Sequence, residues 1–280
     1  GRTNRGGRGG SGHSSRGGGD GEPGSPHIPK RMVHRGREVR SIDEAHEAGI
    51  LLELAHDQIG CRFLQDQLDL RHRPHVTLIF EAVKPDVVIL SSDPFGNYLV
   101  QKLLQFGTDE QRDEIVSSFG ERMTEVALNV HGTRVVQKMV ECADSPAQAA
   151  LITGALVPRV MELLRDTNGN HVIQKCLAAL PASASLPIFE RVSSDVLAIA
   201  SHRHGCCVLQ RCLDHAQPAQ RDAIIQEVIG HAAQLVVDPF GNYVVQYILA
   251  LKQPPLSQAI VASLRGRFAE LSLQKFSSNV

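Results

Sequence analysis

Apolar residues recur along this chain with the period of amphipathic helices. Six similar segments each open with a glycine, and the third, fourth, seventh and eighth residues after it are apolar almost throughout; in one copy these are Leu99, Val100, Leu103 and Leu104. At about 100° per residue, those four positions share one face of a helix, while the first, second and fifth share another. The pattern predicts a helix in each segment, with its apolar face in a core and its first, second and fifth positions facing outwards.

The six segments are copies of one repeat. They open with Gly60, Gly96, Gly132, Gly169, Gly205 and Gly241. Successive copies start 36 or 37 residues apart, a period typical of two-helix solenoid units, and an incomplete seventh copy opens at Ser277. The stretches between the copies, such as residues 113–127 and 222–236, carry Ile, Val and Leu at helical spacing. We therefore predict an all-α array of two-helix repeats.

An acidic or amide residue precedes most copies. Asp57, Asp93, Asn129, Asp166 and Asp238 each lie four residues before the first position of a copy. Such side chains accept hydrogen bonds from the free backbone N–H groups at a helix start. Each copy is therefore expected to begin its helix close to the glycine.

Composition is compatible with a large core and with a reducing compartment. The chain has 280 residues, of which 42% are hydrophobic and 21% charged, and no apolar run approaches the roughly 18 residues of a membrane-spanning helix. The six cysteines follow no secretory signal, which favours free thiols. His202, His204, Cys206 and Cys207 are the nearest approach to a metal cluster, but they occupy ordinary repeat positions. We predict neither a metal nor a cofactor.

Charge is distributed unevenly along the chain. The net charge is −1, yet residues 1–40 carry nine Lys and Arg against three acidic residues, so the remainder is acidic. Glycine and Arg-Gly-Gly triplets dominate the start, which predicts a disordered Gly/Arg-rich tail and linker over residues 1–40. Such a tail either contacts RNA non-specifically or is a plain linker. The Ser41 to Glu44 spacing resembles a capping box and places the folded repeat domain at residues 41–280.

Three polar positions recur on the predicted outward face. Counting from the residue after the glycine, position one holds Cys61, Asn97, Thr133, Asn170, Cys206 and Asn242, and position five holds Gln65, Gln101, Gln137, Gln174, Gln210 and Gln246. Position two holds Arg62, Tyr98, Arg134, His171, Cys207 and Tyr243, and the flanking position six holds Lys102, Lys138, Lys175 and Arg211. Planar groups can stack on unpaired bases, a glutamine amide can bond a base edge, and cations attract phosphates.

This arrangement predicts a single-stranded nucleic-acid surface with one base-sized site per repeat. The alternative is an α-scaffold that binds protein through the same face. The chain shows no nucleophile with a base and no phosphate loop, so we do not expect an enzyme.

The copies at residues 97, 170 and 242 and the KFSSN sequence from Lys275 resemble the repeats of the Pumilio (PUF) family of RNA-binding proteins, in sequence and in order over residues 50–280. The resemblance implies a right-handed α-solenoid, an armadillo-like crescent, with single-stranded RNA on its concave face and the N-terminal repeats at the RNA 3′ end. It also implies that an eighth repeat and a C-terminal cap are missing, so we expect a C-terminally truncated domain with repeats one to six and part of repeat seven.

The family's reading code, carried over residue by residue, implies the site 5′-GUAUAUA-3′. Repeats one to six would read A, U, A, U, A and U, and repeat seven would read G with Ser278 at the base edge and Asn279 at the stacking position. Cys207 departs from the planar residue usual at position two. The resemblance further implies a monomeric cytoplasmic protein that binds mRNA 3′ untranslated regions (3′ UTRs), regulates translation and recruits deadenylase or translational repressor proteins. A nucleolar relative acting in ribosome assembly is the alternative within the family.

Overall fold

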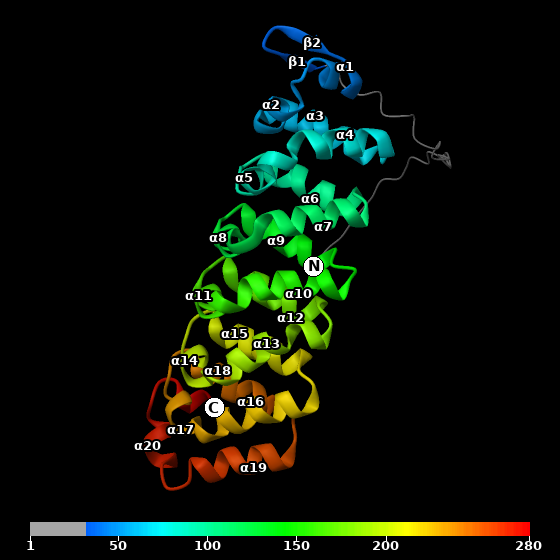
Figure 1. The fold of residues 1–280 in the computed structure, drawn as a ribbon. Helices are drawn as coiled ribbons and strands as arrows, with labels where there is room; N and C mark the ends of the chain where they lie inside the picture. The colour runs from blue at the N-terminus through cyan, green and yellow to red at the C-terminus, as the bar shows by residue number, and fades with distance from the viewer. Residues whose placement is uncertain (1–31) are drawn as a thin grey trace, which may run out of the picture.

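Stacked helices account for nearly all of the protein, in a computed structural model that describes residues 32–280. The six copies form a row of helices, here called the motif helices: α3 (Gln58–Asp69), α6 (Gly96–Phe106), α9 (Gly132–Glu141), α12 (Gly169–Ala179), α15 (Gly205–His215) and α18 (Gly241–Ala250). Each packs on the next along the array, and Figure 1 shows the units following one another from the blue N-terminal end to the red C-terminal end. The predicted all-α repeat architecture is confirmed.

Two further helices complete each unit, where one had been predicted. A long helix follows each motif helix: α4 (Arg73–Val83), α7 (Asp109–Phe119), α10 (Pro146–Leu156), α13 (Ala182–Ser193), α16 (Pro218–Gly230) and α19 (Pro254–Ser263). A short helix precedes each motif: α2 (Leu51–His56), α5 (Val87–Ser91), α8 (Met123–Leu128), α11 (Val160–Arg165), α14 (Val196–Ala200), α17 (Ala232–Leu235) and, before the seventh copy, α20 (Phe268–Ser272). The short helices line up along one edge in Figure 1.

Local breaks explain the third helix. Three-residue 3₁₀ turns separate the long from the short helix in three units: η1 (Lys84–Asp86), η2 (Gly120–Arg122) and η3 (Val157–Arg159). Pro85 and Pro158 lack the N–H that would continue the ladder, and Gly120 has a positive φ of 47°. Because the backbone turns at these points, one continuous apolar pattern becomes two helices. A fourth 3₁₀ turn, η4 (Ser277–Asn279), begins the seventh copy.

Capping side chains start the motif helices as predicted. The Asp93 carboxylate accepts from Phe95 N at 2.8 Å and from Gly96 N at 2.7 Å, and Asp57, Asn129, Asp166 and Asp238 do the same in their repeats. In repeat five the acceptor is His202 Nδ1, 3.3 Å from His204 N. Burial, and to a lesser degree the nearby His204 and Arg165, lower the pKa of His202, which keeps the ring neutral and able to accept.

The glycine that opens each motif helix permits a close approach of two helices. A Cβ added to Gly169 would lie 2.9 Å from the backbone oxygen of Leu163, and at Gly205 it would lie closer still to that of Ile199. The short helix therefore packs backbone to backbone against the motif helix of its own repeat. The core then fills with the apolar positions, and Leu99, Val100 and Leu104 are fully buried.

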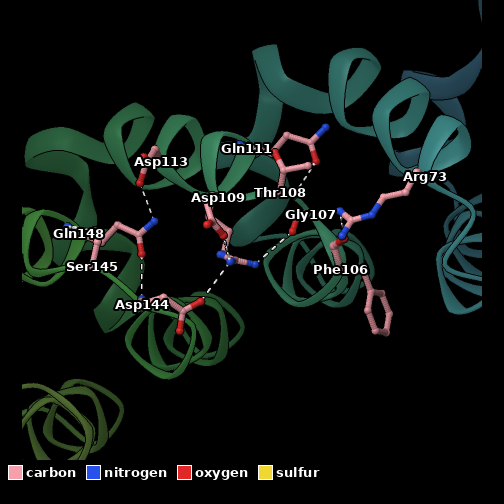
Figure 2. Close-up of polar contacts among 11 residues, drawn as sticks. Arg73, Phe106, Gly107, Thr108, Asp109, Gln111, Asp113, Asp144, Ser145 and Gln148 are labelled. Atoms are coloured by element: carbon pink, nitrogen blue, oxygen red, sulfur yellow. Dashed lines mark hydrogen bonds and ion pairs between the residues drawn. The ribbon is translucent and has the colours of Figure 1, made fainter.

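Polar contacts link successive units at the loops before the long helices (Figure 2). Thr108 and Gln111 form a capping box at α7. Gln111 Nε2 also donates to Thr77 Oγ1 of the preceding unit at 3.3 Å. One unit later, Gln148 Nε2 donates to Asp113 Oδ1 at 2.5 Å. Arg112 adds a bridge, since it bonds the Gly107 carbonyl and pairs with Asp109 and Asp144. These contacts hold adjacent repeats in register.

A β-hairpin precedes the repeats, within the segment predicted to be unstructured up to residue 40. Strands β1 (Met32–His34) and β2 (Arg37–Val39) pair antiparallel, with Met32 opposite Val39, and Arg35 and Gly36 take positive φ angles of 49° and 78° in the turn. Met32 and Val39 are buried against the repeats, which explains why so short a hairpin is ordered. The prediction was therefore wrong for residues 32–39, and the Gly/Arg triplets lie outside the described residues.

The first helix, α1 (Ile42–Glu47), starts where the capping signal had placed it. Ser41 Oγ accepts from Glu44 N at 3.1 Å.

Later in the chain, Pro146–Arg165 has the length and apolar composition of a membrane span, contrary to the expectation from the sequence. That stretch comprises α10, η3 and α11, and its Ile152, Leu156 and Leu163 are buried in the core of the array.

Candidate nucleic-acid interface

Position-one side chains are buried, which corrects the prediction that they face outwards. Cys61, Asn97, Thr133, Asn170, Cys206 and Asn242 are at most 4% exposed. The cause is the neighbouring repeat. Thr133 Oγ1 donates to the Asn168 carbonyl 3.1 Å away, and Cys61 Sγ contacts the Phe95 carbonyl at 3.3 Å. Position one thus lies in the seam between one motif helix and the next.

The glutamine at position five is half-buried and is held by position one of its own repeat. Its Nε2 donates one turn back along the helix to Cys61 Sγ (3.3 Å), Asn97 Oδ1 (3.0 Å), Thr133 Oγ1 (3.1 Å), Asn170 Oδ1 (2.8 Å) and Asn242 Oδ1 (2.8 Å). One amide hydrogen and the carbonyl oxygen of each glutamine remain, a donor and an acceptor side by side. The arrangement repeats in five of the six complete copies.

Two of the three asparagines at position one, Asn97 and Asn170, are fully engaged by the protein. Asn170 Nδ2 donates to the carbonyls of Asp166 and Thr167 at 2.8 and 2.9 Å, while its Oδ1 accepts from Gln174. Both amide hydrogens are therefore used, and Asn97 has the same two backbone partners in its repeat. Position one thus orients the glutamine, and the glutamine carries the polar edge that remains open.

Position-two side chains are exposed, as predicted. Tyr98 is 57% and Tyr243 54% exposed, and Arg62, Arg134, His171 and Cys207 also lie on the surface. In the seventh copy Ser278 and Asn279 are exposed too. In five of the six complete repeats an exposed ring or guanidinium group lies beside the half-buried glutamine of the motif helix.

Every cation at position six is paired with an acidic side chain. Lys102 pairs with Asp69, Lys138 and Lys175 both bond Glu141 at 2.5 and 2.7 Å, and Arg211 pairs with Asp214 at 3.3 Å. Asp69, Glu141 and Asp214 all occupy position nine, about one helical turn after position six. The position-six cations, predicted to attract phosphates, therefore form a row of ion pairs.

Glu141 is the most shared of these acids. Burial alone would raise its pKa, but the hydrogen bonds and charges of Lys138 and Lys175 outweigh burial and hold the pKa below its usual value. The carboxylate thus stays ionised between two lysines of adjacent repeats. Any phosphate that approaches these lysines competes with Glu141.

Repeat five departs from the pattern in three ways. Cys206 Sγ lies 3.4 Å from the Arg203 carbonyl and 4.0 Å from Cys207 Sγ, and Gln210 Nε2 donates across the seam to the Tyr243 carbonyl at 3.4 Å. The glutamine is thus not held by its own position one, and Cys207 supplies no planar group. Burial raises the pKa of Cys206 to about 12, so this thiol is neutral in the seam.

A profile of the Pumilio-family RNA binding repeat matches six stretches of the chain: residues 51–83, 86–118, 122–153, 159–193, 195–229 and 231–264. Most of the chain is covered, and each match begins near a short helix and runs through the motif helix into the long helix. This chain belongs to the Pumilio family.

Known Pumilio proteins resemble it in sequence and in structure. A Pumilio domain-containing protein of Schizosaccharomyces pombe is 42% identical over 157 residues, which is 56% of this chain and 23% of the relative. This chain therefore spans about a quarter of that relative's length. The Puf4 RNA-binding domain bound to the HO endonuclease 3′ UTR recognition sequence superposes with a TM-score of 0.79 at 44% identity, over 82% of this chain and 72% of that one.

A Puf4 double mutant bound to a different RNA is equally similar. It carries the Cox17 3′ UTR recognition sequence and gives a TM-score of 0.79 at 43% identity, again over 82% and 72% of the two chains. These Pumilio repeats are RNA-binding modules and not enzymes, as expected from the sequence.

Proposed function

We propose that this chain binds single-stranded RNA in mRNA 3′ UTRs and reads it one base per repeat along the motif helices. The observation that carries the proposal is the hydrogen bond from the position-five glutamine to position one, which recurs at 2.8 to 3.3 Å in five repeats. Each bond fixes one amide edge beside an exposed position-two side chain. A base can then stack on the position-two group while its edge meets the glutamine.

The proposed site is 5′-GUAUAUA-3′. Asn97, Asn170 and Asn242 would select U with their glutamines, and Cys61, Thr133 and Cys206 would select A. Ser278 and Asn279 would begin the reading of the 5′ G. The regular alternation of these pairs favours messenger RNA recognition over a ribosome-assembly role.

The test exchanges the base preference of one repeat. The double substitution Asn170→Ser with Gln174→Glu places a carboxylate, which only accepts, opposite the two donors of guanine, N1–H and N2–H. Affinity should move from GUAUAUA toward GUAGAUA by about 1–3 kcal/mol, by analogy with base-edge contacts in DNA. Asn242→Ser with Gln246→Glu is the matched control, because it should move the preference to GGAUAUA and leave the fourth base unaffected.

The outcome distinguishes sequence-specific reading of bases from non-specific RNA binding. A preference that follows each mutated repeat supports one base per repeat. Equal affinity of the wild type for GUAUAUA and a scrambled strand of the same composition would contradict sequence-specific reading altogether.

A second test concerns Thr133 and Cys207 and the preference of the chain between two 3′ UTR sequences. The Puf4 mutant bound to Cox17 RNA has a threonine changed to cysteine and a cysteine changed to arginine, and these lie as far apart in sequence as Thr133 and Cys207 do here. We infer that Thr133→Cys with Cys207→Arg raises the affinity of this chain for the Cox17 recognition sequence relative to the HO sequence. Competition binding with the two RNAs measures the ratio, and an unchanged ratio would refute the inference.

We further propose a cytoplasmic, monomeric protein that regulates translation through recruited deadenylase or repressor proteins. Support comes from the 3′ UTR sequences bound by Puf4. A reporter mRNA with GUAUAUA in its 3′ UTR should have a shorter poly(A) tail or be translated less when the repeats of this chain bind it. A reporter with the scrambled site should not respond.

A further inference from the structure

Repeat one carries a polar residue at a position that is apolar in the other complete repeats. Position seven holds Leu103, Met139, Cys176, Cys212 and Ile248 in repeats two to six, but Gln67 in repeat one. Gln67 is only 3% exposed, and within residues 32–280 its side-chain amide makes no hydrogen bond. The amide is not among the sealed side-chain atoms without a partner in that range, which are His75 Nδ1 and Arg112 Nε. Its polar atoms therefore stay accessible from outside the helix stack and can bond a ligand.

A cavity of about 680 Å³ lies against this residue. Ile59, Phe63 and Gln67 are spaced by four along α3 and form one stripe of its lining, and Met32 of β1 lines it as well. In later repeats the preceding motif helix packs against this side of the helix. Of the residues from 32 onwards that precede repeat one, the short hairpin covers this side of the helix, and it leaves the space open.

The cavity is continuous with the base-reading row. Arg62, Gln65 and Tyr98 line it too, and these are the position-two and position-five groups of repeats one and two. Arg62 is steadied by Asp66, its partner at 3.4 Å. A base bonded to Gln65 would lie on one side of Arg62. The stripe that contains Gln67 lies on the opposite side of Arg62, further around the same helix.

The lining has the chemistry of a nucleobase pocket. Phe63 and Phe95 give planar apolar walls, Arg62 gives a guanidinium plane, and the Gln67 amide offers one donor and one acceptor to a base edge. Pockets of this size with a few convergent polar groups are the usual form of small-molecule sites. A phosphate group would be repelled by the carboxylate of Asp66, which also lines the cavity.

We propose that this cavity binds one further nucleotide of the RNA, directly 3′ of the base read by repeat one, with Gln67 bonded to the edge of that base. The proposal rests on the proposed function and extends the site to 5′-GUAUAUAN-3′. The added base lies between Arg62 and the hairpin, and it gives the Gln67 amide a hydrogen-bonding partner.

The experiment measures the affinity of the full chain for GUAUAUA carrying, at its 3′ end, each of the four nucleotides or an abasic nucleotide. At least one base should bind about fivefold or more tighter than the abasic strand, the ratio that corresponds to the lower end of base-stacking energies. Gln67→Leu, which copies Leu103 of repeat two, should abolish this gain and leave the affinity for GUAUAUA itself within about twofold. Gln105→Leu, an exposed glutamine of the next motif helix, should leave the gain intact.

Each outcome decides between the two proposals. If GUAUAUA binds no better than its scrambled counterpart, the proposed function fails. If GUAUAUA binds specifically but the 3′ base gives no gain, or if the gain survives Gln67→Leu, the pocket proposal is overturned while the proposed function stands.

Discussion

Repeats four and five are neighbours with the same helices, yet they present different surfaces to a base. In repeat four, Asn170 holds Gln174 at 2.8 Å and His171 offers an exposed ring. In repeat five the corresponding glutamine turns to the Tyr243 carbonyl, and the exposed group is the thiol of Cys207. The same helical scaffold thus carries different exposed side chains at position two. On the proposed function, base stacking depends on these exposed side chains, which the core does not need, and four predictions test this separation.

The largest expected effect concerns the scaffold, where the two repeats should behave alike. Gly169→Ala and Gly205→Ala each force a methyl group into the backbone of the preceding short helix, so each should lower the free energy of unfolding by about 3 kcal/mol. The loss should be greater at Gly205, where the approach is closer. Urea unfolding followed by circular dichroism measures both.

The matched control for this pair is Gly154→Ala, in α10. An added Cβ there meets nothing within 4 Å, so the substitution should stabilise the helix by about 0.5–1 kcal/mol. If Gly169→Ala and Gly205→Ala were as harmless as this control, the backbone contact between short and motif helices would not be a constraint.

The next effect concerns stacking, where the two repeats should differ. His171→Cys gives repeat four the surface of repeat five and should weaken GUAUAUA binding, whereas Cys207→Arg supplies a planar group to repeat five and should strengthen it. Each change should amount to about 1–2 kcal/mol if one base stacks on each side chain. Both differences should disappear when the base facing the mutated repeat is replaced by an abasic nucleotide, which fluorescence anisotropy can measure.

A smaller effect concerns the cations at position six. Lys138→Ala with Lys175→Ala should weaken all RNAs alike. The slope of log affinity against log salt should become shallower by about 0.7 for each phosphate of the single strand that these lysines neutralise. Glu141→Gln should have the opposite effect, because it frees both lysines from their shared carboxylate. An unchanged salt slope in the double alanine variant would show that these lysines do not bind phosphate.

The smallest effect is a pH dependence confined to repeat five. Burial lowers the folded-state pKa of His202, so its stabilising cap is intact above the ordinary histidine value of about 6.5 and is progressively lost as pH falls below it. Hydrogen exchange at the start of α15 should therefore rise at pH 5.5 relative to the start of α12, which Asp166 caps. His202→Asn, which copies the cap of repeat three, should remove the difference.

Local properties of the sequence predicted most of the fold. Spacing alone predicts which positions of a helix face the core. Val135 and Val136 were predicted in this way, and they are fully buried. The caps were predictable because Asp93 and its counterparts act on backbone groups only two and three residues away. The exposure of position two followed from the same helical geometry.

Features that depend on a neighbouring element were missed. Thr133 is buried because the next motif helix covers it, and no spacing within one helix reveals that neighbour. The pairing of Glu141 was missed because this residue occupies position nine, one residue after the last position used in the sequence analysis. Two overlooked features did leave a signal: Arg35-Gly36 between short extended segments is a hairpin turn, and Gln67 breaks an otherwise apolar position.

In the proposed code position one selects the base, so its burial places RNA specificity in the protein's interior. A lineage that changes its target must alter a side chain sealed between two repeats, so the substitutions open to it are those of similar volume that still accept a hydrogen bond from the glutamine. Cysteine, threonine and asparagine share the six complete positions here, and in all but repeat five the side chain accepts the hydrogen bond of its glutamine. Targets can then drift by single isosteric exchanges within a small alphabet, whereas bulky residues are removed by selection for stability before their effect on RNA recognition matters.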